Sequence, residues 1–213
     1  MAYDWVPKTK LGKSVMNGEI TSLDKIFEQG YKITEPEIVE KLLPGLKTEI
    51  VFIGGSPGKG GGIKRTPTRR TARMHRSGRR YKISALVIAG NEDGYVGIGK
   101  AVGTENRIAI EKATKLAKIN IIPVQRGCGS WECNCHGTHS IPFTTSGKSG
   151  SNKIVLMPAP KGIGLCIGDE GKKLMRLAGI RDIWVKSYGN TRARVNFLSA
   201  LFNVFKNINK TKT

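Results

Sequence analysis

Four side chains that bind metals well lie near the middle of this chain, at Cys128, Cys133, Cys135 and His139. Thiolates and imidazole suit Zn²⁺, and a structural zinc site uses four such ligands. Residues 125–140 have little apolar content beyond Trp131, so hydrophobic burial alone would hold this loop weakly. His139 is preferred to His136, because the residues that follow Cys135 give the chain room to turn back. The spacing predicts a Zn²⁺ site, and the alternative is a loop with free thiols.

No other group of residues predicts catalysis. The chain has three histidines, no serine at a strand-to-helix elbow and no paired carboxylates beside a base. The glycine-rich stretch 54–62 fails the phosphate-binding pattern GxxxxGK[ST], because Gly60 follows Lys59. A nucleotide-dependent enzyme is therefore the weaker alternative, and a lack of ATP binding in calorimetry would exclude it. We expect a binding or structural protein that is not an enzyme.

The charge of the chain indicates a polyanionic partner. Lysine and arginine number 36 against 16 acidic residues, a formal net charge of +20. Residues 1–49 hold seven lysines and eight acidic residues, so the excess lies in the rest of the chain. Between Glu49 and Glu92 there are ten basic residues and no acidic one, and the basic run passes directly into the apolar strand 83–88. A packed sheet would thus hold a cationic loop, as nucleic-acid binding requires.

The segments before the cationic stretch are predicted to be short. Residues 1–21 are expected to form an extended arm. Ser22 would cap a short helix that runs through Gln29, and the capping box at 34–37 would open a second helix. A strand at 48–53 and a flexible loop at 54–62 would follow.

The next segments predict a compact α+β unit. A hairpin with arms at 81–89 and 95–100 is joined through Asn91-Glu92-Asp93-Gly94, a strong turn signal. A helix then runs from Thr104 or Glu105 to about Asn120. One of its faces is expected to be buried and another to be basic, with Ala109, Ala113, Leu116 and Ala117 on the first and Lys112, Lys115 and Lys118 on the second. Strands followed by such a helix are the order of a double-stranded-RNA-binding-like domain.

The last third of the chain predicts a second unit of β-α-β-α order. Its elements are a strand at 153–157, a helix at 170–178 closed by Gly179, a strand at 183–186 and a helix at 191–205. Residues 167–171, Ile-Gly-Asp-Glu-Gly, match the GXXG loop of KH domains. Asp169 and Glu170 have the wrong charge to face phosphates, so a helix start within a protein-contact surface is the preferred interpretation.

Four motifs in register resemble one known family. They are Ser77-Gly78-Arg79-Arg80, Val96-Gly97-Ile98-Gly99-Lys100, Met157-Pro158-Ala159-Pro160-Lys161-Gly162-Ile163-Gly164 and Ala178-Gly179-Ile180. Their order and spacing, from about residue 46 to 205, resemble the universal small-subunit ribosomal protein S-five family. The cysteine loop and the N-terminal helices look like its archaeal type.

The resemblance implies a fold, a place and neighbours. The fold is α+β, a double-stranded-RNA-binding-like domain followed by a β-α-β-α domain of the S-five C-terminal type. The role is a structural constituent of the small ribosomal subunit that binds ribosomal RNA at the head–body junction and supports translational accuracy. The neighbours are proteins S-four, S-eight and S-three and the messenger RNA path into the subunit. Gly168 and Lys172 fall where the family carries accuracy positions at the S-four contact.

These observations lead to residue assignments. The predicted RNA-binding residues are Lys64, Arg65, Arg69, Arg70, Arg73, Arg76, Ser77, Gly78, Arg79, Arg80, Lys82, Lys100, Lys112 and Lys115. The predicted division is 1–48 as an arm with two short helices, 49–124 as the RNA-binding-like domain, 125–151 as the cysteine-containing linker loop, 152–207 as the C-terminal domain and 208–213 as a basic tail.

Two expectations concern the setting. No apolar run approaches the roughly 18 residues of a membrane span, so we expect a cytoplasmic protein, in the ribosome and without a membrane partner. The alternative function is a free RNA-remodelling or ribosome-assembly factor, which would not co-sediment with small subunits after a high-salt wash.

Overall fold

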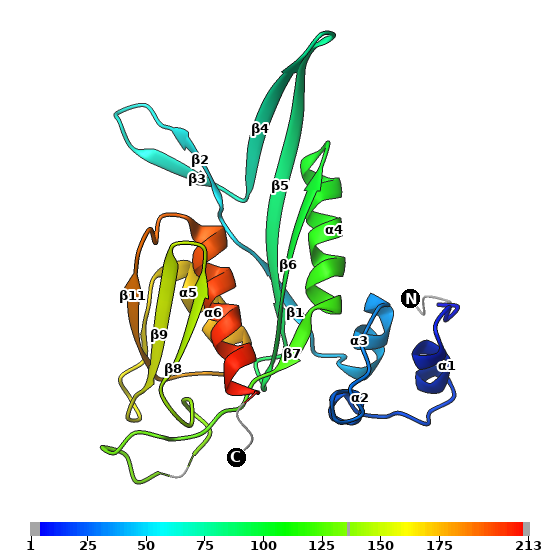
Figure 1. Ribbon diagram of the computed structural model, residues 1–213, viewed down its shortest axis with the longest axis vertical. Coiled ribbons are helices and arrows are strands. Elements are labelled where there is room, and N and C mark those ends of the chain that lie inside the picture. The colour runs from blue at the N-terminus through cyan, green and yellow to red at the C-terminus, as the bar shows by residue number, and fades with distance from the viewer. Residues whose placement is uncertain (1–4, 136, 211–213) are drawn as a thin grey trace.

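Two larger sheets with helices on their faces organise the chain in the computed structural model, which describes residues 5–135 and 137–210 (Figure 1). The α+β class predicted from the sequence is confirmed. Across the part of the chain that is described, every helix is too short or too polar to cross a lipid bilayer.

The first sheet is antiparallel and is covered by one helix. Its path runs in the order β1-β5-β6-β7, and β4 pairs with the outer part of β5. These strands are β1 (Lys47–Ile50), β4 (Thr68–His75), β5 (Gly78–Gly90), β6 (Tyr95–Gly103) and β7 (Ile121–Pro123), and the helix is α4 (Asn106–Ile119). The β5–β6 hairpin and α4 confirm two elements predicted from the sequence.

The inner part of β5, residues 85–90, is buried on both faces, because alternate side chains meet different partners. Ala85, Val87 and Ala89 pack against the alanines of α4, while Leu86 and Ile88 join the core of the C-terminal half. Gly99 permits the close approach of α4, since a Cβ there would lie 2.0 Å from the carbonyl oxygen of Ala113. The sheet is therefore shared between two layers.

The second sheet belongs to the C-terminal half and is mostly antiparallel, in the order β10-β11-β9-β8. Its strands are β8 (Thr145–Ser149), β9 (Asn152–Pro158), β10 (Leu165–Cys166) and β11 (Ile183–Tyr188), and its helices are α5 (Asp169–Leu177) and α6 (Arg194–Ile208). Side chains from α5 and α6 share one core with Leu86, Ile88 and Val96 of the first sheet. The two halves are thus joined by continuous hydrophobic packing.

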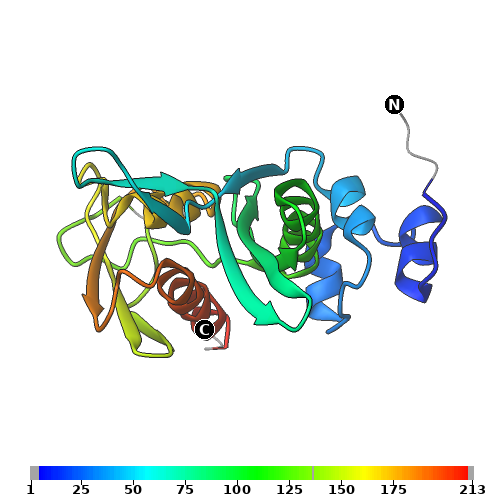
Figure 2. The ribbon, with the colours of Figure 1, turned by 90° about the horizontal axis from the view of Figure 1, so that it is seen from above.

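Three helices precede the first sheet: α1 (Lys10–Met16), α2 (Leu23–Glu28) and α3 (Pro36–Leu42). The expected extended arm is wrong, because Thr9 caps α1 by accepting the Gly12 N–H at 3.0 Å. The expected capping box is also wrong: Glu35 is the N-cap of α3, and its carboxylate accepts the Thr9 N–H instead. Helix α3 lies against α4, and the three helices form the end of the molecule farthest from the C-terminal half (Figure 2).

Other differences lie where the sequence is rich in glycine or charge. Residues 54–66 form a hairpin, β2 (Gly54–Pro57) with β3 (Ile63–Thr66), in place of the expected flexible loop at 54–62. The cationic run forms β4 rather than a loop. Strand β8 lies within 125–151, which was expected to be a linker loop. Leu116, expected in the buried face of α4, is 38% exposed.

Candidate nucleic-acid interface and metal centre

The most basic part of the chain is a long two-stranded projection. Strands β4 and β5 pair from Thr68↔Ala85 to His75↔Gly78, and the pair extends past the end of α4 (Figure 1). Gly78, at φ +101°, closes the turn at the tip, where Arg80 Nη2 donates to Ser77 Oγ at 3.1 Å. Paired residues on an antiparallel ladder share a face, so Arg73 and Arg80 lie on the same side of the projection.

Two grooves run along this projection, and seven of the fourteen predicted residues line them. A cavity of about 780 Å³ between the two hairpins is lined by Arg65, Arg69 and Arg70. Arg70 stacks over the Tyr81 ring, 3.6 Å from its centroid, which leaves the guanidinium edge for an anion. A second cavity of about 730 Å³ lies between the projection and α4 and is lined by Arg80, Lys82 and Lys112.

The predicted residues that line neither groove are Lys64, Arg73, Arg76, Gly78, Arg79, Lys100 and Lys115. Lys100 on β6 and Lys115 on α4 are exposed but line neither cavity. Lys118, considered for the same helix face, is bound instead by Glu40 of α3. Among the described residues, no carboxylate lies within ion-pair distance of the cations from Lys64 to Lys82.

Gly168 and Lys172 lie at the start of α5, where Gly168 is the N-cap. Lys172 Nζ is 3.7 Å from Asp169 Oδ1, an exposed pair. Sequence reasoning missed the adjacent Glu170, which is 9% exposed and receives Arg194 at 3.0 Å and Lys173 at 3.2 Å. The spacing of Glu170 and Lys173 on one helix face was the available signal.

Two of these cations also hold the connection between the halves. Lys173 Nζ donates to the Ile50 carbonyl, and Arg194 Nη1 donates to the Phe52 carbonyl at 2.6 Å. Glu170 therefore anchors the chain after β1 against α5 and α6. Of the two carboxylates in the KH-like loop, Glu170 is inside the protein and Asp169 is exposed.

The predicted metal ligands come together in one cluster. Their ligating atoms all lie within 4.8 Å of one another. Cys135 Sγ is 3.1 Å from both Cys133 Sγ and His139 Nε2, and Cys133 Sγ is 3.8 Å from His139 Nε2. The sulfur–sulfur separation is longer than a disulfide, of about 2 Å, and shorter than the roughly 3.8 Å edge of a tetrahedral zinc site. Three sulfurs and one imidazole nitrogen are a donor set that fits a metal ion.

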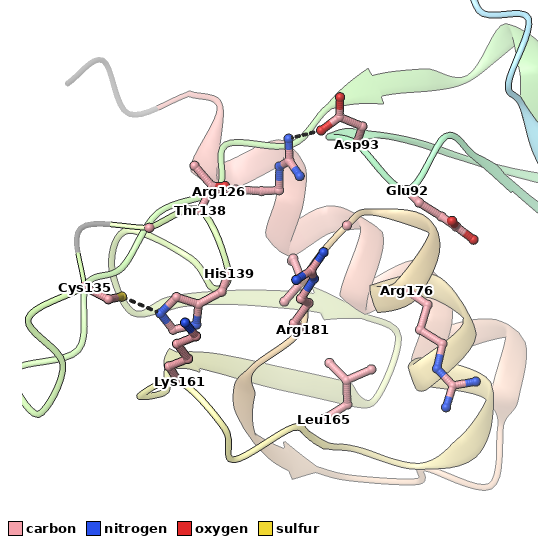
Figure 3. Close-up of a pocket in the computed structure, with 13 residues that line it drawn as sticks. Glu92, Asp93, Arg126, Cys135, Thr138, His139, Lys161, Leu165, Arg176 and Arg181 are labelled. Atoms are coloured by element: carbon pink, nitrogen blue, oxygen red, sulfur yellow. Dashed lines mark hydrogen bonds and ion pairs between the residues drawn. The ribbon is translucent and has the colours of Figure 1, made fainter.

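A backbone bridge closes the loop that carries this cluster. Gly127 and Ser140 exchange two hydrogen bonds, at 2.9 and 3.0 Å. The Ser140 hydroxyl accepts the Ala159 N–H at the end of β9. Figure 3 shows Cys135, His139 and Lys161 together on the wall of a cavity of about 800 Å³. The cluster is therefore fixed to the C-terminal half.

The thiols in the cluster differ in acidity. Hydrogen bonds, first from Cys135 and then from the backbone of Lys161, lower the pKa of Cys133 to about 6. Burial raises the pKa of Cys128 to about 11. The lowered pKa favours the thiolate form of Cys133, which is the form that binds metals.

Sequence reasoning missed Asp182, whose carboxylate lies behind the cluster. Its Oδ2 is 2.9 Å from His139 Nδ1, and the residue is 5% exposed. No local signal connects the two, because they are separated by β8, β9, β10 and α5. The fold alone brings them together.

Comparison with known proteins gives one consistent result. Residues 67–125 match the family described as ribosomal protein S5, N-terminal domain, and residues 147–213 match its C-terminal domain. A small ribosomal subunit protein uS5 of Pyrobaculum aerophilum is 47% identical over 95% of this chain and 86% of its own length. Proteins of the same name are 46% identical in Methanothermobacter thermautotrophicus, over 98% of this chain and 90% of theirs, and 45% identical in Methanocaldococcus jannaschii, over 99% and 90%.

Proposed function

The chain belongs to the ribosomal protein S5 family, and we propose that it is a structural constituent of the small ribosomal subunit that binds ribosomal RNA through the β4–β5 projection. The observation that carries the proposal is the row of exposed cations along β4 and β5, none of them paired with a described carboxylate. A folded protein keeps such a row of uncompensated charge where a polyanion neutralises it. The grooves on the two sides of the projection suit a shaped RNA rather than a flat surface.

Salt-dependent RNA binding tests this role. Fluorescence anisotropy with a structured fragment of small-subunit RNA should give an affinity that falls by orders of magnitude between about 50 and 200 mM salt, if roughly six or more phosphates are contacted. Arg73→Glu should weaken binding strongly. The matched control is Lys148→Glu, an exposed cation on β8, which should leave the affinity nearly unchanged. An RNA affinity that does not change with salt concentration would contradict the phosphate-contact model.

We also place the protein at the junction of head and body, beside proteins S-four, S-eight and S-three and the messenger RNA path. Family membership supports this placement, and so does the exposed start of α5 at Gly168. Lys172→Glu should raise misreading of near-cognate codons while subunits still assemble, because it alters a contact surface and not the core. Unchanged fidelity, or loss of assembled subunits, would count against this assignment.

The cysteine cluster is proposed to bind one Zn²⁺, through Cys128, Cys133, Cys135 and His139. The support is the convergence of four suitable donor atoms in a loop that carries the 91% exposed Trp131. This loop has little hydrophobic packing, and a bound zinc ion would cross-link it instead. Native mass spectrometry should find stoichiometric zinc that is lost in Cys133→Ser. Metal-free protein whose four thiols all react rapidly with a thiol reagent would contradict the proposal.

A further inference from the structure

Asp182 has a buried carboxylate whose contacts join two parts of the molecule. Its Oδ1 accepts the N–H groups of Gly162 and Gly164, at 3.1 and 2.8 Å. Its Oδ2 lies 2.9 Å from His139 Nδ1. Burying a carboxylate is costly unless it is paired and hydrogen-bonded. Within the described chain His139 is the basic side chain within ion-pair distance of Asp182, so a buried carboxylate lies behind a histidine of the cysteine cluster.

The position of that anion fixes the role of each ring nitrogen. A carboxylate at Nδ1 favours the tautomer that carries its proton there, which leaves Nε2 with a free lone pair. Nε2 is the nitrogen that faces the thiols, 3.1 Å from Cys135 Sγ. Nδ1 is buried and has no well-aligned hydrogen bond, although the Asp182 oxygen is within range. A bond from Nε2 to a metal would fix the ring and settle this alignment.

The turn held by Asp182 also lies beside the cluster. Residues 160–164 connect β9 to β10, and Lys161 lines the same cavity as Cys135 and His139. Gly162 and Gly164 have φ values of +99° and +78°, and a Cβ at either would meet nothing within 4 Å. This turn is held by the two N–H groups that point at Asp182 and by the Gly164 carbonyl, which accepts the Ile183 N–H at 3.1 Å, and not by packing of its glycines.

We propose that Asp182 positions His139 for Zn²⁺ and that the metal, through His139 and Asp182, orders the 160–164 turn. This inference rests on the proposed zinc site. Removing the carboxylate behind a metal-bound histidine typically lowers metal affinity about 10–100-fold. Coupling between two sites is reciprocal, so zinc should stabilise the Asp182 contacts with Gly162 and Gly164 by the same factor. Lys161, on the wall of the 800 Å³ cavity, would then be held in place by the metal.

Two measurements on the full chain test the coupling. A competition titration with a chromophoric chelator should show zinc binding about 10–100-fold weaker in Asp182→Asn than in the wild type. Hydrogen exchange of the Gly162 and Gly164 amides should accelerate about 10–100-fold when zinc is removed from the wild type, by reciprocity. In Asp182→Asn these amides should exchange rapidly even with saturating zinc. Asp169→Asn, at an exposed carboxylate on α5, is the control and should match the wild type.

Each outcome either supports or overturns the proposal. Wild-type protein that binds no zinc refutes both the site and the coupling. Suppose that the wild type does bind zinc. Then an unchanged zinc affinity in Asp182→Asn overturns the coupling alone, and so does hydrogen exchange at Gly162 and Gly164 that does not depend on zinc. If Asp182→Asn does not fold, His139→Cys replaces it, because cysteine keeps a metal ligand and removes Nδ1. Hydrogen exchange of the Gly162 and Gly164 amides should then no longer depend on zinc. Exchange that depends on zinc as strongly as in the wild type would contradict the proposal.

Discussion

Arg73 of β4 lies directly opposite Arg80 of β5 in the antiparallel register of the projection. Like charges opposite each other on a ladder destabilise it by a few tenths to about 1 kcal/mol. The described chain offers no carboxylate within ion-pair distance of either guanidinium. The free protein therefore carries a repulsion that bound phosphate would relieve.

This relationship predicts that one substitution changes stability and binding in opposite directions. Arg73→Thr removes the repulsion and places a good strand former on β4, so hydrogen exchange across 68–85 should slow in the free protein. RNA affinity should fall, and the salt slope should shrink by about one, as expected for one lost phosphate contact. Faster exchange together with unchanged affinity would show that Arg73 acts within the fold and not on RNA.

The Glu170 network predicts a large loss of stability from one neutral substitution. Glu170→Gln leaves Lys173 and Arg194 without their carboxylate in a site where all three side chains are mostly buried. Allowing for partial exposure of the two cations, the free energy of unfolding should fall by about 1–3 kcal/mol. Urea denaturation measures it. Asp169→Asn, at a carboxylate that is 95% exposed, should change it by less than about 0.5 kcal/mol.

The close packing of α4 on β6 predicts an intolerance of side chains at Gly99. A Cβ there would lie 2.0 Å from the Ala113 oxygen and 2.3 Å from the Ala117 nitrogen. Gly99→Ala should lower stability by about 1–3 kcal/mol or more, because the helix must move away from the sheet. Thermal unfolding of Gly62→Ala provides the comparison, since a Cβ at Gly62 meets nothing within 4 Å. Equal melting temperatures for Gly99→Ala and Gly62→Ala would show that α4 moves to accept the added side chain at little cost.

The elements that could be predicted from the sequence are those with local signals. The turn at 91–94 has its own side-chain hydrogen bonds, in which Asn91 Oδ1 accepts the N–H groups of Asp93 and Tyr95. Helix α4 repeats alanine at helical spacing, and the predicted metal ligands are close to one another in sequence. Such features are stabilised by residues within one short window.

The elements that could not be predicted depend on distant partners. Strand β4 has no apolar alternation, because it is exposed along nearly all its length, and β5 is its partner in the sheet. The β2–β3 hairpin is similarly exposed and rich in glycine. The expected capping box at 34–37 is replaced by Glu35 as the N-cap, whose carboxylate accepts the N–H groups of Lys8 and Thr9. Asp182 meets His139 only after the second sheet has formed.

A last prediction concerns how the N-terminal helices attach to the first sheet. The Tyr95 hydroxyl donates to Asp24 of α2, and the rings of Tyr95 and Phe27 stack at 6.4 Å between centroids. Burial, followed by the hydrogen bond to Asp24 and by the charges of Asp24 and Asp93, raises the pKa of Tyr95 above its ordinary value of about 10. At neutral pH, Tyr95→Phe should lower the free energy of unfolding by about 1–2 kcal/mol through loss of that hydrogen bond.

The sign of the pH dependence follows from the raised pKa. Above about pH 10 the unfolded chain loses the tyrosine proton while the folded protein keeps it, so folded stability falls as pH rises. The wild type should therefore lose its advantage over Tyr95→Phe as the pH rises above 10, in urea denaturations from pH 7 to 11. Comparison of variants removes the common contribution of the lysines. Tyr188→Phe, at an exposed tyrosine on β11, should run parallel to the wild type. A constant gap between wild type and Tyr95→Phe across this range would mean that Tyr95 titrates as a free phenol and does not secure α2.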